Sequence, residues 1–128
     1  MVATVVAPRL TAAQVIILAA DELMAGERRE FSEWELTVAS WGRDKARFGL
    51  RGFDQAHPDH KRVMMEIMGK KASSPIQQLY LEKVRPNYYR LTPLGAKRLA
   101  QMKAEWHSFA EKIDRLMNAA AAAERSRP

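Results

Sequence analysis

Helix-start signals recur along the chain, and they constrain its fold more than any other feature. The first N–H groups of a helix lack intrahelical acceptors, and a Ser, Thr or Asp side chain at the N-cap supplies one. Such residues open five segments with helical spacing of apolar residues: Thr11, Ser32, Asp59, Ser74 and Thr92. Gly, Pro and Asn close these segments. We therefore expect helices over residues 11–25, 32–41, 59–69, 74–84 and 93–123.

A short strand is expected between the last two helices. Arg85-Pro86-Asn87 is a turn signal, and Tyr88-Tyr89-Arg90-Leu91 is rich in the residues that strands favour. The sequence thus predicts a mainly α fold with a small β-hairpin.

Length and composition exclude several classes of protein. The 128 residues suit one domain with an additional helix, and 47% of them are hydrophobic, which is enough for a core. The chain has no cysteine, which excludes disulfides, thiolate zinc sites and cysteine nucleophiles. The longest apolar run, residues 15–20, is far shorter than the about 20 residues of a membrane span. No basic residue precedes the apolar stretch of residues 1–9, unlike a signal peptide. We expect a soluble, cytoplasmic protein.

The net charge of +6 is concentrated in one part of the chain. Residues 59–98 contain nine basic and three acidic residues, whereas residues 1–58 contain seven basic and eight acidic ones. A local positive excess favours a surface that binds a polyanion. A solvated basic face without a partner would have the same composition.

The last helix carries an apolar stripe with seven-residue spacing. Its members fall three or four residues apart, as in the seam of a coiled coil: Leu99, Met102, Trp106, Phe109, Ile113 and Leu116. We expect residues 99–123 to be a dimerisation helix that mixes with the helix over residues 11–25, which is apolar on several faces. Packing of these two helices within one chain is the competing explanation.

Residues 1–10 and 124–128 are expected to be flexible ends.

Residues 43–58, called the insertion below, fit no simple element. Ordered loops of this length are uncommon and often functional. Phe48, Leu50 and Phe53 are apolar and predict that the loop folds onto the core. His57 and His60 lie three residues apart, but no third ligand accompanies them, so no metal or other cofactor is expected. No pattern of catalytic residues is present either, and we do not expect an enzyme.

Residues 79–95 end in Leu91-Thr92-Pro93-Leu94-Gly95 and resemble the end of a winged helix-turn-helix domain. In that family a recognition helix is followed by a two-stranded wing and then by a Leu-Thr-x-x-Gly helix start. The likeness covers about residues 31–98 and is to regulators of the multiple-antibiotic-resistance and phenolic-acid repressor type. It implies a winged-helix domain over residues 11–98 and a homodimeric, sequence-specific regulator that binds double-stranded DNA. The short wing turn and the long insertion depart from the family pattern and argue against minor-groove contacts by the wing.

The resemblance makes residues 59–69 the first helix of the motif, and residues 74–84 its recognition helix. A helix N-terminus suits a phosphate independently of any family, because its N–H groups are free and partly positive. Glutamine amides suit adenine in the major groove, and arginines beside the wing suit phosphates. The expected DNA-binding residues are Lys70, Lys71, Ser73, Ser74, Gln77, Gln78, Arg85 and Arg90.

Two alternatives stay open at this point. The first is that residues 59–69 are themselves the recognition helix, which would move base contacts to Lys61, Arg62 and Met65. The second is that the same fold is a protein-interaction module that uses its apolar surface in a larger assembly, without specific DNA binding. No small-molecule effector can be named from the sequence.

Overall fold

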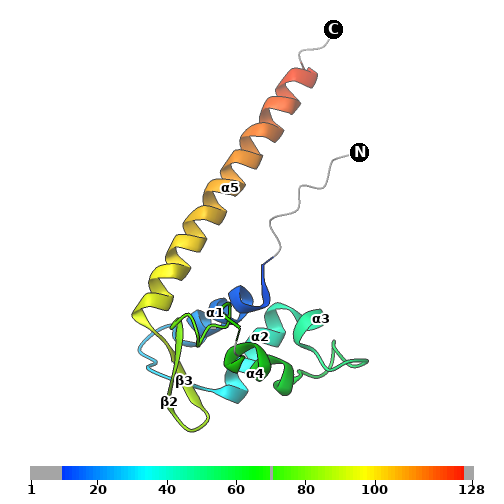
Figure 1. Ribbon diagram of the computed structural model, residues 1–128. Helices are drawn as coiled ribbons and strands as arrows, with labels where there is room; N and C mark the ends of the chain where they lie inside the picture. The colour runs from blue at the N-terminus through cyan, green and yellow to red at the C-terminus, as the bar shows by residue number, and fades with distance from the viewer. Residues whose placement is uncertain (1–9, 70, 126–128) are drawn as a thin grey trace. The chain divides into compact units, whose positions relative to one another are not determined.

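Helices start at four of the five expected N-caps. The computed structural model describes residues 10–69 and 71–125, except for the side chains of 124 and 125. The predicted flexible N-terminus lies outside these residues apart from Leu10, as do positions 126–128 of the predicted tail. The elements in chain order (Figure 1) are α1 Ala12–Leu23, β1 Phe31–Ser32, α2 Glu33–Arg43, α3 Lys45–Phe48, α4 His60–Met68, β2 Leu81–Arg85, β3 Tyr88–Leu91 and α5 Pro93–Arg125.

Side-chain caps fix the helix starts. Thr11 Oγ1 accepts from the Gln14 N–H at 3.2 Å, which confirms the predicted N-cap of α1, and the Gln14 side chain accepts in return from the Thr11 N–H to complete a capping box. Ser32 and Glu35 form the same reciprocal pair on α2, at 3.1 Å each way. Asp59 caps α4.

The three strands form one antiparallel sheet in the order β1-β3-β2. Phe31 of β1 pairs with Tyr89 of β3, and Leu81 of β2 pairs with Leu91 at the other end of β3. The central strand therefore ties the segment before α2 to the hairpin of β2 and β3, here called the hairpin. The mainly helical fold with a small antiparallel hairpin agrees with the sequence, which did not predict the third strand, β1.

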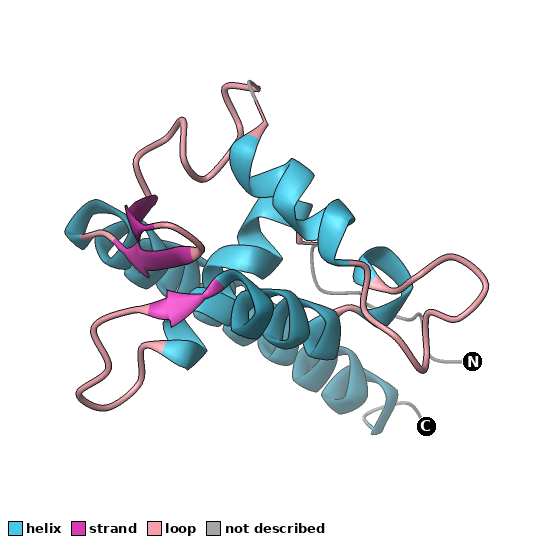
Figure 2. Cartoon of the chain, turned by 90° about the horizontal axis from the view of Figure 1, so that it is seen from below, coloured by secondary structure: helices cyan, strands magenta, loops and turns pink. Residues whose placement is uncertain are grey.

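The core of residues 10–99 lies between α1, α2, α4 and the sheet. Helix α1 is buried over six consecutive residues, Val15 to Ala20, as its apolar sequence predicts. Side chains from each of the other elements complete the core: Phe31, Leu36, Phe48, Val63, Ile67, Leu81 and Tyr89. In Figures 1 and 2, α4 lies between the hairpin on one side and the insertion on the other.

Two of the large apolar residues of α2 lie outside its buried face. The spacing of Trp34, Val38 and Trp41 predicts one helix face, but Trp34 is 56% and Val38 54% exposed, while Leu36, Thr37 and Ser40 are buried. The small side chains of Thr37 and Ser40 allow α2 to pack closely in the core. The large side chains Trp34 and Val38 are left on the outside.

The insertion folds onto the core through one of its three expected apolar residues. Phe48, at the end of α3, is fully buried. Leu50 and Phe53 are exposed, so the prediction that they pack inward is wrong. Both belong to a turn at the tip of the insertion, beyond the reach of the core.

The predicted helix over residues 74–84 is wrong. Residues 74–80 form turns, and the segment continues as β2. One helical hydrogen bond forms, from the Gln78 N–H to the Ser74 carbonyl, but Leu79 then adopts a left-handed conformation with φ of 61°. A left-handed residue ends a helix. The second half of the expected helix instead forms β2, which pairs with β3 across the turn at Pro86 and Asn87.

The Leu-Thr-Pro-Leu-Gly sequence has a structural role at the start of α5. Thr92 Oγ1 accepts from the Gly95 N–H at 2.9 Å and caps the helix. The same hydroxyl donates to the carbonyl oxygen of Leu79 at 2.5 Å. A Cβ on Gly95 would lie 2.3 Å from the Tyr80 carbonyl oxygen, so only glycine permits this approach. The motif thereby joins α5 to the turn that precedes β2.

The chain divides into residues 10–99 and a second unit that contains α5 from Ala100 onward. The helix continues to Arg125, two residues into the predicted tail. In the described part of the chain, no helix is both long and apolar enough to cross a membrane.

Candidate nucleic-acid interface

Helix α4 presents a face of basic side chains and methionines to solvent. Val63, Met64 and Ile67 face the core, which leaves the opposite side to Lys61, Arg62, Met65 and Met68. This division follows from the 3.6-residue helical period.

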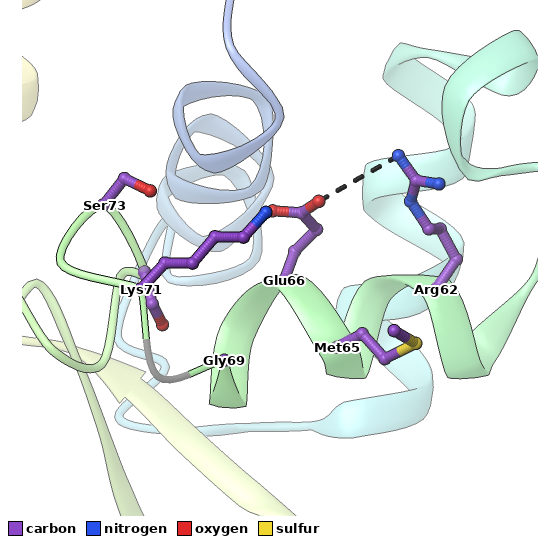
Figure 3. Close-up of a pocket in the computed structure, with 7 residues that line it drawn as sticks. Arg62, Met65, Glu66, Gly69, Lys71 and Ser73 are labelled. Atoms are coloured by element: carbon purple, nitrogen blue, oxygen red, sulfur yellow. Dashed lines mark ion pairs between the residues drawn. The ribbon is translucent and has the colours of Figure 1, made fainter.

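A groove of about 370 Å³ runs beside α4, and Figure 3 shows the side chains that line it. We call it the α4 groove. Arg62 lies 4.0 Å from the Glu66 carboxylate, a loose and half-exposed pair. An exposed pair of this kind contributes about 0–1 kcal/mol, so its guanidinium can exchange the carboxylate for an anionic ligand. The groove is lined by Arg62, Met65, Glu66, Gly69, Lys71, Ser73 and Ser74.

Three of the expected DNA-binding residues line this groove, although they do so from a turn rather than a helix. Lys71 and Ser73 are exposed. Ser74 is buried, and its hydroxyl donates to the Ile67 carbonyl at 2.5 Å. It therefore joins the turn to the end of α4 and caps no helix, which corrects the predicted role of Ser74 as the N-cap of a recognition helix.

The two glutamines are separated from the groove. Gln77 and Gln78 are exposed on the single helical turn after Ser74, but neither lines the α4 groove. Lys70 lies outside the described residues.

The hairpin arginines are present on the surface and already paired. Arg85 donates two hydrogen bonds to Glu30 Oε1, at 2.6 and 3.0 Å, and its guanidinium lies 3.6 Å from the centre of the Tyr88 ring. The hydrogen bonds to Glu30 raise the pKa of Arg85. Arg90 pairs with Glu82 across the strands. Lys83 is exposed on β2 and has no ion pair within residues 10–69 and 71–125.

Histidine and aromatic side chains meet where α2 and α4 begin. The imidazole of His60 stacks on Trp34 with ring centres 3.9 Å apart, and His60 Nε2 lies 3.2 Å from Glu33 Oε1. His57 lies in the insertion, where its ring is 6.4 Å from that of Phe53. Among the described residues, no group of three or more His, Cys, Asp and Glu side chains could hold a metal ion.

The predicted dimer stripe changes its exposure along α5. Leu99 and Met102 are buried, Trp106 and Ile113 are half-buried, and Phe109 and Leu116 are exposed. Leu116 is 71% exposed, and its neighbour Met117, which the stripe did not include, is 46% exposed.

No protein-family model, no curated protein and no solved structure matches this chain.

The alternative set of base-contacting residues, on residues 59–69, lies together on one exposed helix face. Lys61, Arg62 and Met65 were the alternative set, and they occupy the outward face of the one helix that directly precedes the hairpin in the described chain. The sequence signal that could have identified this face is the strong amphipathic pattern of residues 60–68. The glutamines lack such a helix, because their segment leaves the helical conformation at Leu79 and continues as β2.

Proposed function

We propose that residues 10–99 are a winged helix-turn-helix domain that binds double-stranded DNA in a sequence-specific manner, with α4 as the recognition helix. The order of elements supports this proposal: α4 precedes the two-stranded hairpin, and the hairpin leads through Leu-Thr-Pro-Leu-Gly into α5. The main support is the outward face of α4, where Lys61, Arg62 and Met65 stand on a rigid helix whose other side is core.

The side chains on this face suit the major groove. Lysine and arginine donate to the O6 and N7 acceptors of guanine, and an apolar side chain such as Met65 contacts the thymine methyl group. Lys71 and Ser73 lie along the α4 groove and can donate to phosphate oxygens beside the bases. Phosphate contacts position the helix, and base contacts give it specificity.

We further propose that the protein acts as a homodimeric transcriptional regulator joined through α5. The part of the helix beyond Ala100 has an exposed apolar side at Phe109, Leu116 and Met117. Exposed apolar side chains at seven-residue spacing favour pairing of helices. A dimer would present two copies of α4 to half-sites about one DNA turn apart.

A protein-interaction module is the second candidate, and one observation favours it. Trp34, Val38 and Met68 are large apolar side chains that are more than half exposed on α2 and α4. Such side chains are common where proteins bind one another.

Binding to duplex DNA at several salt concentrations separates the two functions. Each phosphate contact releases counterions, so log affinity should fall with log salt at a slope of about −0.9 per contact. The DNA for this measurement would be duplexes that the protein enriches from a random library. We expect tight binding at low salt and a steep slope, whereas an interaction module would bind all duplexes weakly.

Lys71→Ala tests the location of the interface. It should make the slope shallower by about 0.9, because Lys71 is proposed to contact a phosphate. Arg115→Ala is the charge-matched control, because Arg115 lies on α5 outside the apolar stripe and pairs only loosely with Glu111. Equal slopes for the two variants would contradict a phosphate contact by Lys71.

A further inference from the structure

The insertion is an ordered structure rather than a loose connection. An antiparallel bridge between Gly49 and Pro58 closes its base, and the Leu50 N–H donates to the His57 carbonyl at 2.8 Å. Trp41 Nε1 of α2 donates to the Asp54 carbonyl at 2.7 Å. A Cβ on Gly49 would lie 2.4 Å from the Asp54 Cα, so the two arms of the insertion cross in close contact.

A tight turn forms the tip of the insertion. The Phe53 N–H donates to the Leu50 carbonyl at 2.7 Å, and Gly52 adopts a φ of 84°, which glycine allows without strain. This turn presents Arg51 and Phe53 to solvent. Arg51 forms no ion pair with any residue in the described ranges, 10–69 and 71–125.

The tip faces α4 across a second groove, of about 440 Å³, which we call the insertion groove. Arg51 lines it from the insertion and Arg62 from α4. Arg62 also lines the α4 groove, so the two grooves meet at this side chain. The exposed cations Arg51, Arg62 and Lys71 thus line two adjoining grooves that share Arg62.

The other charged residues of the insertion groove have structural partners. Asp54 Oδ2 accepts from the Gln55 side chain at 3.2 Å, and Arg62 keeps its loose pair with Glu66 at 4.0 Å. Arg47 pairs with Asp44 at 3.5 Å and donates to the Leu10 carbonyl at 2.8 Å. Asp59 caps α4 by accepting from the Arg62 N–H at 3.2 Å. Arg51 is therefore the cation in this groove whose whole guanidinium is available to a ligand.

We propose that the tip of the insertion is a second DNA-contacting element, in which Arg51 binds a backbone phosphate beside the base pairs contacted by α4. This inference rests on the proposed function. A guanidinium presents two parallel N–H donors that match a phosphate. The hairpin is less suited to this contact, because its arginines are paired with Glu30 and Glu82. The insertion thus provides, at the start of α4, the flanking contact that the short wing lacks.

Salt-dependent binding of Arg51→Ala to duplex DNA tests this role. We expect its slope to be shallower than that of the parent by about 0.9, and its affinity at 0.1 M salt to be about five- to tenfold weaker. The loss should be equal on enriched and random duplexes, because a phosphate contact carries no sequence information. Arg51→Lys should keep most of the slope of log affinity against log salt, because it keeps the charge. Arg115→Ala should have the slope of the parent.

The outcomes separate this inference from the proposed function. A parent chain that binds no duplex at low salt overturns both. A parent that binds, together with an Arg51→Ala variant of equal slope and affinity, overturns only the second contact. A loss confined to the enriched sequence also overturns it, because that result would make Arg51 a base-reading residue. Thermal unfolding of each variant confirms that the folded chain is being compared.

Discussion

Single residues at tight contacts determine where the elements of residues 10–99 meet. Gly95 is the clearest example, because its missing side chain lets the first turn of α5 approach the backbone of Tyr80. Gly95→Ala should lower the free energy of unfolding by about 1–3 kcal/mol, since the obstructing atom is backbone and cannot rotate away. Urea unfolding measures the effect.

Gly42→Ala is the control for this substitution. Gly42 is also helical, but a Cβ there meets no atom within 4 Å. Alanine is the better helix former, so this variant should be as stable as the parent or more stable by up to about 1 kcal/mol. Equal destabilisation by the two substitutions would show that Gly95 is not a close-contact position.

Glu35 links stability to pH. The hydrogen bond from Arg28, followed by that from the Ser32 N–H, lowers the pKa of Glu35 below its usual 4.5. A lowered pKa in the folded state means that this stabilisation is present above pH 4.5 and is lost as the pH falls through the folded pKa. Glu35→Gln should therefore reduce the free energy of unfolding at neutral pH by about 0.2–1 kcal/mol, as expected for an exposed pair, and should flatten the acid dependence.

Urea unfolding at pH 7 and at pH 3 checks this expectation. Glu27→Gln is the control, because Glu27 is exposed and forms no ion pair in the described part of the chain. If Glu35→Gln keeps the full acid dependence of the parent, another group is responsible for it.

At the scale of elements, the turn after α4 depends on a buried hydroxyl. Ser74→Ala removes the buried hydroxyl that donates to the Ile67 carbonyl. We expect a loss of about 1–3 kcal/mol in the free energy of unfolding. Ser73→Ala, one residue earlier and exposed, should be neutral. An unchanged stability of Ser74→Ala with weakened DNA binding would instead restore Ser74 as a phosphate contact.

The sequence predicts helix starts well, because they depend on residues close together in the chain. The capping boxes at Thr11 and Ser32 and the cap at Asp59 were found from sequence, because each depends on residues within one helical turn. The segment after Ser74 has an equally good start signal, but its second half pairs with β3, with Leu81 opposite Leu91. Strand pairing depends on packing against the neighbouring strand and on burial. The helical spacing of apolar residues carries no information about either.

The candidate site was predicted in part for the same reason. Lys71 and Ser73 lie in a turn after α4, as the sequence predicts, but the recognition helix expected to begin after them does not form. The insertion groove could not be predicted, because it requires that a bridge at Gly49 and Pro58 bring Arg51 to face Arg62. The charge excess of residues 59–98 also omits Arg51, which belongs to a segment of nearly balanced charge.

At the scale of the whole molecule, the proposed dimer depends on α5. Trp106→Glu with Ile113→Glu places two charges in the apolar stripe, and we expect the variant to be monomeric while residues 10–99 stay folded. Light scattering of the parent and the variant at micromolar concentration measures the mass. Ser108→Glu with Arg115→Glu adds charges on exposed positions outside the stripe and should stay dimeric.

Two results would contradict the dimer. A monomeric parent removes it directly. A double variant that simply unfolds would assign the stripe to the core of one chain, and the expectation of paired half-sites would then lose its basis.

The central claim is that α4 recognises DNA, and the ratio of affinities for an enriched duplex and a random duplex tests it most directly. Lys61→Ala should reduce this discrimination by about 1–3 kcal/mol, the value of one good base contact. Gln77→Ala with Gln78→Ala, on the turn outside the α4 groove, should leave the discrimination unchanged. Recognition by α4 is contradicted if the glutamine variant loses discrimination between the two duplexes and the Lys61 variant keeps it.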